Sequence, residues 1–391
     1  MTTTYQQQTY AFLDEQEIAQ YVKKLELFPQ AAELQVVEIS DGKINHVFRI
    51  YSQEHSVIYK QAVPYARTVG EDMPLPLERV RVEAEVLQQY EKIIVGSVPK
   101  VLHLDSDLAI LITEDMAPLE VGRTALINDT ESSHFAKDIG AFMATTMFYT
   151  SDFYLDSSTK KQKIQQFINA GMTDLTEELT FDRPYQVDDS NFFEDSLHDD
   201  VVWLSQDSKL HLEVAKLKRR FQNTKDALIH GDLHSGAIML GNGRTVVFDT
   251  EFACYGPFGF DLGQFVANLW INGIGKQSSK YNRYRQSLET WYAFVERFTA
   301  LWRTEAKERY TKVDGYLTAV LDEIREDMFG FAGCELIRRA IGIAQIPDLN
   351  HEEEESLRAA NRRECVELGK YLIFNRQSIQ SIEQIADWFK A

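Results

Sequence analysis

Residues 228–236 read Leu-Ile-His-Gly-Asp-Leu-His-Ser-Gly, and residues 247–251 read Val-Phe-Asp-Thr-Glu. The first stretch places Asp232 in a polar turn between two apolar runs. The second places Asp249 and Glu251 at the end of the next apolar run. The 17 positions from Asp232 to Asp249 have the length of a loop, a short hairpin and a second loop. The chain therefore presents three carboxylates on two neighbouring turns.

Asp232 is the first candidate for a catalytic residue. An Asp in a turn often bonds only to its own backbone, but Asp232 is surrounded by His230, Gly231 and His234, and an acidic pair follows downstream. In phosphoryl transfer to a hydroxyl, one carboxylate orients the hydroxyl and accepts its proton, while others hold Mg²⁺ on the phosphates of ATP. The pattern predicts Asp232 as the catalytic base.

Asp249 and Glu251 are the predicted metal ligands. In an extended segment, residues two apart point the same way, so both carboxylates can face one ion. Mg²⁺ prefers oxygen ligands, often one or two carboxylates with phosphates and waters. His230 and His234 have a spacing that suits zinc only on a helix, and Gly231 argues against a helix there. We expect the two histidines to orient Asp232 and the backbone.

Lys60 ends a β-branched run, where a buried Lys would bind ATP phosphates. The amphipathic helix predicted over Leu77–Tyr90 carries Glu83 on its apolar stripe, and an acid there needs a cationic partner. Glu85 is the alternative partner for Lys60. The turn Ser40–Asn45 has one glycine and would cover the triphosphate, which makes Asn45 a nucleotide-binding candidate.

Arg338 and Arg339 lie inside an apolar helical segment, and buried arginines need acidic partners. Two adjacent residues on a helix span a wedge of about 100°. Both arginines could therefore reach one oxygen-rich ligand, and they are candidates for substrate binding. An internal ion pair is the other interpretation.

The order of elements predicts an α+β fold. Strands are expected at 34–39, 47–51, 56–60, 98–104 and 108–112, with one helix over Leu77–Tyr90. Beyond a connector at Glu114–Met116, helices are expected near 133–150, 159–180, 207–224, 261–271, 281–306, 316–345, 352–374 and 378–390, and strands only around 226–250. This order matches a bilobal protein-kinase-like fold: a β-rich nucleotide-binding lobe at 1–116 and a helical catalytic and substrate lobe at 117–391.

Composition narrows the function further. The chain has 391 residues, with 41 Lys and Arg against 60 Asp and Glu, and a formal net charge of −19. This charge argues against general binding to nucleic acid or to anionic membranes. Three cysteines without a C-x-x-C pair favour reduced thiols. The N-terminus has no apolar signal segment, and no apolar run is long enough to cross a bilayer. We therefore expect a cytoplasmic protein.

The chain resembles the 5-methylthioribose kinases, a family within the group of aminoglycoside phosphotransferases and choline kinases. The matching blocks extend from about residue 34 to 345. They are Ser40–Arg49, Lys60–Glu71, the Asp232 loop, Asp249–Gly263 and Glu335–Arg339.

The resemblance implies ATP-dependent phosphorylation of the 1-hydroxyl of 5-methylthioribose, a step of methionine salvage. It implies that Asp232 is the base, that Asp249 and Glu251 form the D-x-E metal motif, and that Lys60 binds phosphate. By the same resemblance, the backbone of Glu114 and Met116 bonds adenine, and Arg338 and Arg339 bind the sugar and the developing phosphate. The implied assembly is a homodimer.

The chain departs from the family pattern at four positions. Ala237 stands where the wider group has a metal-binding Asn, so Glu251 would carry more of the metal binding. Thr250 replaces Pro, Cys254 replaces an aromatic residue, and Met73 stands where Trp is expected.

Three other functions share parts of this pattern. The same chemistry on another small alcohol or sugar, and a catalytically silent binding protein on a kinase fold, stay open as alternatives. A metallophosphatase would need further Asp, Asn and His ligands.

Overall fold

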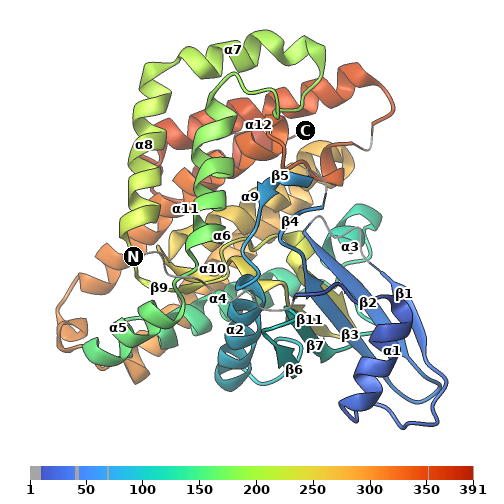
Figure 1. The fold of residues 1–391 in the computed structure, drawn as a ribbon. Helices are drawn as coiled ribbons and strands as arrows, with labels where there is room; N and C mark the ends of the chain where they lie inside the picture. The colour runs from blue at the N-terminus through green and yellow to red at the C-terminus, as the bar shows by residue number, and fades with distance from the viewer. Residues whose placement is uncertain (1–9, 40–43, 68–69, 351, 391) are drawn as a thin grey trace, which may run out of the picture. The chain divides into compact units, whose positions relative to one another are not determined.

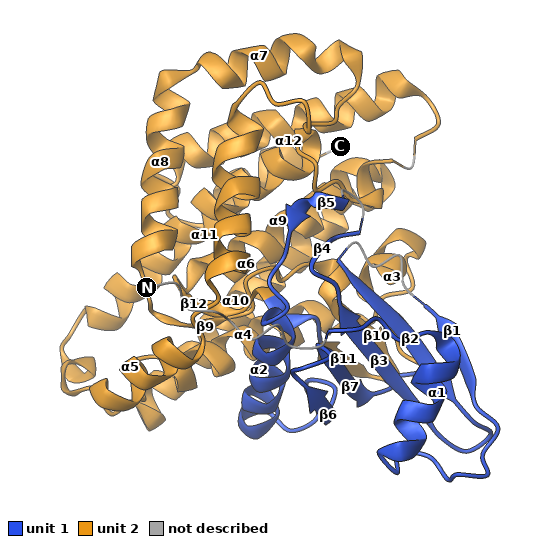
Figure 2. Cartoon of the chain, in the orientation of Figure 1, with its two compact units in different colours: residues 1–117, 248–251 blue, residues 118–247, 252–391 orange. Residues whose placement is uncertain are grey.

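The computed structural model describes residues 10–39, 44–67, 70–350 and 352–390. The chain forms two compact units, coloured blue and orange in Figure 2. Unit 1 comprises residues 1–117 and 248–251, and unit 2 comprises residues 118–247 and 252–391. The short segment 248–251, which carries Asp249 and Glu251, thus belongs to the β-rich unit although it lies far along the sequence.

Unit 1 is built on an antiparallel sheet with the strand order β1-β2-β3-β7-β6. Its elements are α1 (Glu15–Lys24), β1 (Gln35–Glu38), β2 (Asn45–Tyr51), β3 (Ser56–Ala62), β4 (Tyr65–Ala66), β5 (Gly70–Pro74), α2 (Arg79–Ile93), β6 (Val101–Asp105) and β7 (Ile110–Glu114). Figure 1 shows β2 and β3 as long neighbouring strands. All five expected strands of this region are present, with small shifts at their ends.

The core of unit 1 explains where Lys60 points. Val57 and Tyr59 of β3 are fully buried and cluster with Ile18 and Val22 of α1. Because side chains alternate along a strand, Lys60 faces the opposite side of the sheet. In the register of the sheet, Lys60 lies between Val47 of β2 and Leu111 of β7.

The prediction of a single helix in this region was wrong, because α1 precedes the sheet. Its start has a local explanation: the Asp14 side chain accepts hydrogen bonds from the N–H groups of Gln16 and Glu17, and the Glu17 side chain accepts one from the N–H of Asp14. This reciprocal capping box is a sequence signal for a helix start.

Unit 2 is mainly helical. Its helices are α3 (Gly122–Asn128), α4 (Phe135–Thr150), α5 (Ser157–Gln166), α6 (Ala170–Glu177), α7 (His198–Gln206), α8 (Ser208–Asn223), α9 (Gly259–Gly275), α10 (Lys280–Glu305), α11 (Tyr316–Ile341) and α12 (Glu355–Asn375). Its strands are β8 (Glu120–Val121), β9 (Ala227–Ile229), β10 (Ile238–Gly241), β11 (Arg244–Val247) and β12 (Cys254–Gly256). The strands form two small sheets, β11-β10-β8 and β12-β9.

The helix α9 lies at the centre of unit 2, since all of its residues from Gly259 to Gly275 are buried. A Cβ on Gly263 would lie 2.7 Å from the carbonyl oxygen of Met328, which shows how closely α11 approaches α9. These two helices carry Asp261 and the Arg338–Arg339 pair, so the packing of α9 on α11 positions the catalytic loop and the arginines.

Several helix predictions for unit 2 needed correction. The helix expected over 159–180 is interrupted between α5 and α6, where the Asn169 side chain donates to the Ala253 carbonyl oxygen instead of continuing a helical face. The helix expected over 316–345 ends at Ile341, and the segment expected as a helix at 378–390 is a 3-10 helix over Ile382–Phe389. The helices α3 and α7 and the short strands β8 and β12 were not predicted.

Gly140 of α4 offers a test of the helix packing. A Cβ at this position would lie 2.2 Å from the carbonyl oxygen of Thr290 on α10. Gly140→Ala should therefore lower the free energy of unfolding by about 2 kcal/mol, because rigid backbone must move to make room. Lys137→Ala, at an exposed position of the same helix, should change it by less than about 0.5 kcal/mol. Urea unfolding of both variants measures the difference, and equal stabilities would contradict the close contact.

Candidate active site

The candidate catalytic residues form two groups, one in each unit. In unit 1, the ammonium group of Lys60 lies 2.5 Å from Asp249 Oδ1, 2.7 Å from Glu83 Oε2 and 3.3 Å from Glu251 Oε1. Burial alone would lower the pKa of Lys60, but the three carboxylates raise it well above its ordinary value. Lys60 is therefore a charged, fixed cation, as the binding of phosphate oxygens requires.

The structure distinguishes between the two candidate partners of Lys60. Glu83, on the buried face of α2, makes the ion pair. Glu85 pairs with Arg81 at 2.8 Å on the same helix. Burial raises the pKa of Glu83 to about 8, since the Lys60 charge only partly offsets the loss of solvent.

Asp249 and Glu251 differ sharply in their surroundings. The side chain of Asp249 is 40 % exposed and that of Glu251 is 2 % exposed. Asp249 has a φ of +65°, a left-handed conformation that costs energy for a residue with a side chain. Such strained positions gather at functional sites, where the surrounding structure enforces them.

Glu251 is held by several donors. Asn45 Nδ2 lies 2.9 Å from both Glu251 oxygens, and Arg79 Nε lies 3.1 Å from Oε2. The buried side chain of Asn45 thus anchors Glu251, whereas the sequence pattern suggested a contact to the nucleotide. The metal role of Glu251 and the nucleotide role of Asn45 stay predictions.

Sequence reasoning missed Arg79, a fully buried residue at the start of α2. Its guanidinium donates to Glu251, to Asn45 Oδ1 and to the carbonyl oxygens of Ile44, Val63 and Pro76. A signal was available, since Arg79 precedes Glu83 by four positions and so lies on the same helix face.

The residues of unit 1 fit a magnesium ion. Within the described ranges, no set of three or more His, Cys, Asp or Glu side chains is arranged to hold a metal by itself. Mg²⁺ does not need such a set, because substrate phosphates and waters complete its shell. Asp249 and Glu251 present carboxylate oxygens, the type of ligand that Mg²⁺ prefers, beside Lys60.

The other nucleotide-binding predictions concern the backbone of Glu114 and Met116, which is expected to bond adenine. Glu114 ends β7 and its N–H donates to the carbonyl oxygen of Lys100, while Met116 is buried just before the end of the unit's first segment. The roles of both in adenine binding stay predictions. Ser40–Lys43 of the expected phosphate turn lie outside the described residues.

In unit 2, the loop of Asp232 is shaped by backbone constraints. Gly231 has a φ of +85°, and a Cβ there would lie 2.2 Å from the carbonyl oxygen of Phe252. The carboxylate of Asp261, in the first turn of α9, accepts the N–H of His230 at 2.7 Å and that of Gly231 at 3.0 Å. These contacts fix the chain immediately before Asp232.

The two histidines support the loop, as expected. Nδ1 of His230 accepts the N–H of Asp232 at 3.3 Å, and Nδ1 of His234 accepts the N–H of Gly236 at 2.9 Å. Neutral His234 therefore carries its proton on Nε2, which lies 3.4 Å from Asp232 Oδ2. Burial and the nearby charge of Arg123 lower the pKa of His234, although Asp232 opposes this shift.

Arg338 and Arg339 reach Asp232 directly. Nη2 of Arg338 lies 2.8 Å from Asp232 Oδ1, and Nη2 of Arg339 lies 3.1 Å from the same atom. Burial alone would raise the pKa of Asp232, but His234 and the two guanidinium groups hold it well below its ordinary value. The candidate base is therefore ionised at neutral pH and ready to accept a hydrogen bond from a hydroxyl.

A third arginine, Arg123 of α3, was not identified from the sequence. Its Nε lies 3.1 Å from Asp348 Oδ2, and its Nη2 donates to Asn268 Oδ1 at 3.3 Å. Asn268 in turn donates to Glu335 at 2.9 Å. These residues come from separate helices, and no local pattern links them.

The positions that depart from the family pattern are also located. Ala237, Thr250 and Cys254 are buried, and Cys254 lies in β12 opposite Ile229. Met73 lies in β5. Cys254, Cys334 and Cys365 are all buried free thiols.

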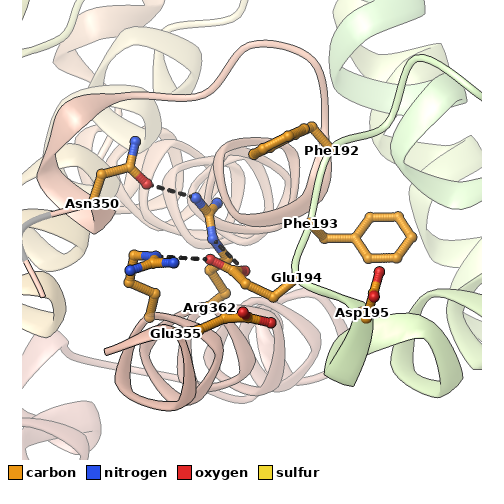
Figure 3. Close-up of a pocket in the computed structure, with 8 residues that line it drawn as sticks. Phe192, Phe193, Glu194, Asp195, Asn350, Glu355 and Arg362 are labelled. Atoms are coloured by element: carbon orange, nitrogen blue, oxygen red, sulfur yellow. Dashed lines mark hydrogen bonds and ion pairs between the residues drawn. The ribbon is translucent and has the colours of Figure 1, made fainter. Parts of the chain in front are cut away.

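A separate pocket of about 440 Å³ lies in unit 2 (Figure 3). Its lining includes Phe192, Glu194, Arg358 and Arg362, and none of the residues predicted for the active site. Glu194 pairs with both arginines, at 3.4 Å and 2.9 Å. Glu194 is therefore engaged in ion pairs within this pocket.

Comparison with known proteins places the chain in a family. Residues 14–306 match the model of the phosphotransferase enzyme family. The chain is 42 % identical over 383 residues to the methylthioribose kinase of Geobacillus sp. strain WCH70, covering 97 % of this chain and 96 % of the relative. It is 41 % identical over 365 residues to the methylthioribose kinase of Bacillus cereus strain ZK / E33L, covering 93 % of each.

A solved structure shows the same fold. The choline kinase from Cryptosporidium parvum Iowa II aligns with a TM-score of 0.54 at 13 % identity, over 96 % of this chain and 100 % of the other. The predicted α+β, protein-kinase-like fold is thereby confirmed. By family model and by identity over nearly its whole length, the chain belongs to the phosphotransferase enzyme family and, within it, to the methylthioribose kinases.

Proposed function

We propose that this protein transfers the terminal phosphoryl group of ATP to the 1-hydroxyl of 5-methylthioribose, a step of methionine salvage. The observation that carries the proposal is the ionised Asp232 carboxylate, bonded on one oxygen by two buried arginines. Curated relatives at 41 to 42 % identity that are named methylthioribose kinase support the choice of acceptor.

In this proposal, the group in unit 1 binds the nucleotide. Lys60, held by Glu83, binds phosphate oxygens, and the backbone of Glu114 and Met116 binds adenine. Mg²⁺ on the phosphates offsets the charge that develops during transfer. Asp249 is the more available ligand because its side chain is more exposed, while Glu251 completes the site from its anchored position.

The group in unit 2 binds the acceptor and removes its proton. Oδ1 of Asp232 is occupied by Arg338 and Arg339, so the hydroxyl would bond to Oδ2, beside His234 Nε2. Phosphoryl transfer passes through a loose transition state, so catalysis depends largely on positioning. An ionised carboxylate that holds the hydroxyl in place provides such positioning.

The charge of the acceptor group also bears on the substrate. Arg338 and Arg339 are paired with Asp232 and Glu335, and their remaining terminal N–H groups suit the oxygen atoms of a sugar whose product is a phosphate. Phosphorylation of another small alcohol and a silent kinase-like binding protein are the other outcomes that an activity screen can return.

The direct test is ATP consumption by the purified protein with methylthioribose, ribose, choline or an aminoglycoside, with Mg²⁺ and with the ion removed by a chelator. We expect consumption with methylthioribose only, and only with Mg²⁺. Consumption with another acceptor would reassign the substrate, and no consumption with any acceptor would favour the silent binding protein.

The proposal further includes a cytoplasmic homodimer, which sedimentation of the purified protein and fractionation of cells would test. Along the residues that the structure describes, no helix combines the length and apolar character needed to cross a membrane.

Replacing the base gives the first prediction on activity. Asp232→Ala should lower kcat by several orders of magnitude and leave the affinity for ATP nearly unchanged, because the carboxylate acts at the chemical step. Steady-state kinetics and ATP titration measure the two effects. Near-normal turnover would remove Asp232 from the mechanism.

The pair Arg338 and Arg339 gives the second prediction on activity. Arg338→Ala or Arg339→Ala should raise KM for methylthioribose more than KM for ATP, since both side chains lie in the acceptor group. Arg358→Ala, which changes an arginine of the separate pocket, is the matched control and should alter neither constant. A loss of ATP affinity with unchanged acceptor affinity would assign the pair a structural role.

The charge of Asp232 gives a prediction on pH. Its pKa is lowered in the folded protein, so its ion pairs stabilise the fold fully above the unfolded value of about 3.9 and lose this contribution as pH falls toward the folded value. The difference in unfolding free energy between wild type and Asp232→Asn should therefore be constant above about pH 5 and shrink below it. Urea unfolding across pH 3 to 7 measures it, and a difference that grows on acidification would contradict the lowered pKa.

A further inference from the structure

The arrangement of Arg338 and Arg339 poses a geometric problem. Neighbouring residues on a helix point about 100° apart, yet the Nη2 atoms of both side chains lie within 3.1 Å of one oxygen, Asp232 Oδ1. Long side chains do not adopt one such geometry unless other contacts restrain them, because ordering an arginine costs rotamer entropy. Some other group must bring the two guanidinium planes together.

Glu335 occupies the position from which this is possible. It precedes Arg338 by three residues and Arg339 by four, so all three share one face of α11. Oε2 of Glu335 lies 2.5 Å from Arg338 Nε, and Oε1 accepts the Nε–H of Arg339 at 2.7 Å. Each carboxylate oxygen thus holds one arginine by the atom nearest its stem.

The remaining contacts keep Glu335 itself in place. The residue is fully buried, and Asn268 of α9 donates to its Oε1 at 2.9 Å. Burial would raise the pKa of Glu335, but Arg338 and Arg339 outweigh this effect and keep it below its ordinary value. Glu335 is therefore an ionised carboxylate between two cations.

Because Glu335 takes the Nε side of each guanidinium, the terminal nitrogens face elsewhere. The terminal nitrogens of Arg338 donate hydrogen bonds to Thr180 Oγ1 and to Asp232. Those of Arg339 donate to the Ala344 carbonyl oxygen and to Asp232. A guanidinium has five N–H groups. In the described part of the chain, the hydrogen bonds named here engage two of the four terminal N–H groups on each arginine, which leaves the others for acceptor or phosphate oxygens.

We propose that Glu335 is a positioning residue for acceptor binding: it fixes both arginines by their Nε atoms so that their terminal nitrogens converge on Asp232 and on the acceptor. The proposal rests on the proposed function of the Asp232 site. Glu335 acts only through Arg338 and Arg339, and does not touch the reacting atoms.

The first experiment shortens the side chain without removing its charge. Glu335→Asp should lower kcat/KM for the acceptor by about 100-fold, since small displacements of catalytic groups have effects of this size. KM for ATP and the melting temperature should stay near wild type. Glu326→Asp, at a partly exposed position of the same helix, is the matched control and should behave as wild type. Retained kcat/KM in a folded Glu335→Asp protein would overturn the proposal.

A double-mutant cycle tests whether Glu335 acts through the arginines. In an Arg338→Met/Arg339→Met background, Glu335→Asp should cause no further loss of kcat/KM, because its targets are gone. A loss of the same size in both backgrounds would overturn the proposal. If Glu335→Asp and Glu335→Gln both fail to fold while Glu335→Gln folds in the double-Met background, Glu335 serves stability instead, and the proposal also fails.

A measurement without acceptor separates this proposal from the proposed function. In nuclear magnetic resonance spectra of the free protein, the Nε–H of Arg339 should exchange slowly with water in wild type and rapidly in Glu335→Gln. Equal exchange rates would overturn the positioning role whatever the substrate. If the rates differ but methylthioribose is not phosphorylated, the choice of substrate fails and the positioning role stands.

Discussion

The ion pairs between Asp232 and the two arginines of α11 are the interaction on which the proposed acceptor site depends. Removing one member of such a buried cluster leaves an uncompensated charge, which typically costs about 3 to 5 kcal/mol. Asp232, Glu335 and Asp348 balance Arg338, Arg339 and Arg123 in formal charge. Two of these carboxylates are contributed by loops or helices distant from their partners in sequence, so the cluster also ties the base loop to the core of unit 2.

The group in unit 1 follows a different electrostatic rule. Here the carboxyl groups of Glu83, Asp249 and Glu251 surround the ammonium group of Lys60, and Asp249 adopts a strained backbone conformation. Burial raises the pKa of Glu83, and the neighbouring Asp249 and Glu251 add to this shift, so the ionised form of Glu83 is unfavourable in the free protein. A divalent cation bound with the nucleotide would relieve this cost. Carboxyl groups thus crowd the proposed metal site, whereas the charges of the proposed acceptor site are paired.

The candidate site residues that the sequence singled out lie in recognisable local patterns. Asp232 stands in a glycine-containing turn, Asp249 and Glu251 end an apolar run, and Lys60 ends a β-branched strand. Arg79, Arg123 and Asp261 were not assigned roles, because each acts on a partner far along the chain: Arg79 reaches Glu251 across 172 positions and Asp261 reaches His230 across 31. Single-residue patterns do not reveal such pairs.

The sequence by itself determined which residues are candidates: the strands of unit 1, the loop of Asp232, the acidic pair Asp249 and Glu251, and the two arginines follow from periodicity, turn residues and charge placed among apolar residues. Only the tertiary structure decided which partner each charge has. In the structure, Lys60 pairs with Glu83 and not with Glu85. Glu251 bonds to Asn45 and Arg79. Glu335 lies between Arg338 and Arg339. The reason is physical, since hydrogen bonds and ion pairs depend on distances of a few ångströms, and helix packing sets these between residues that no local pattern connects.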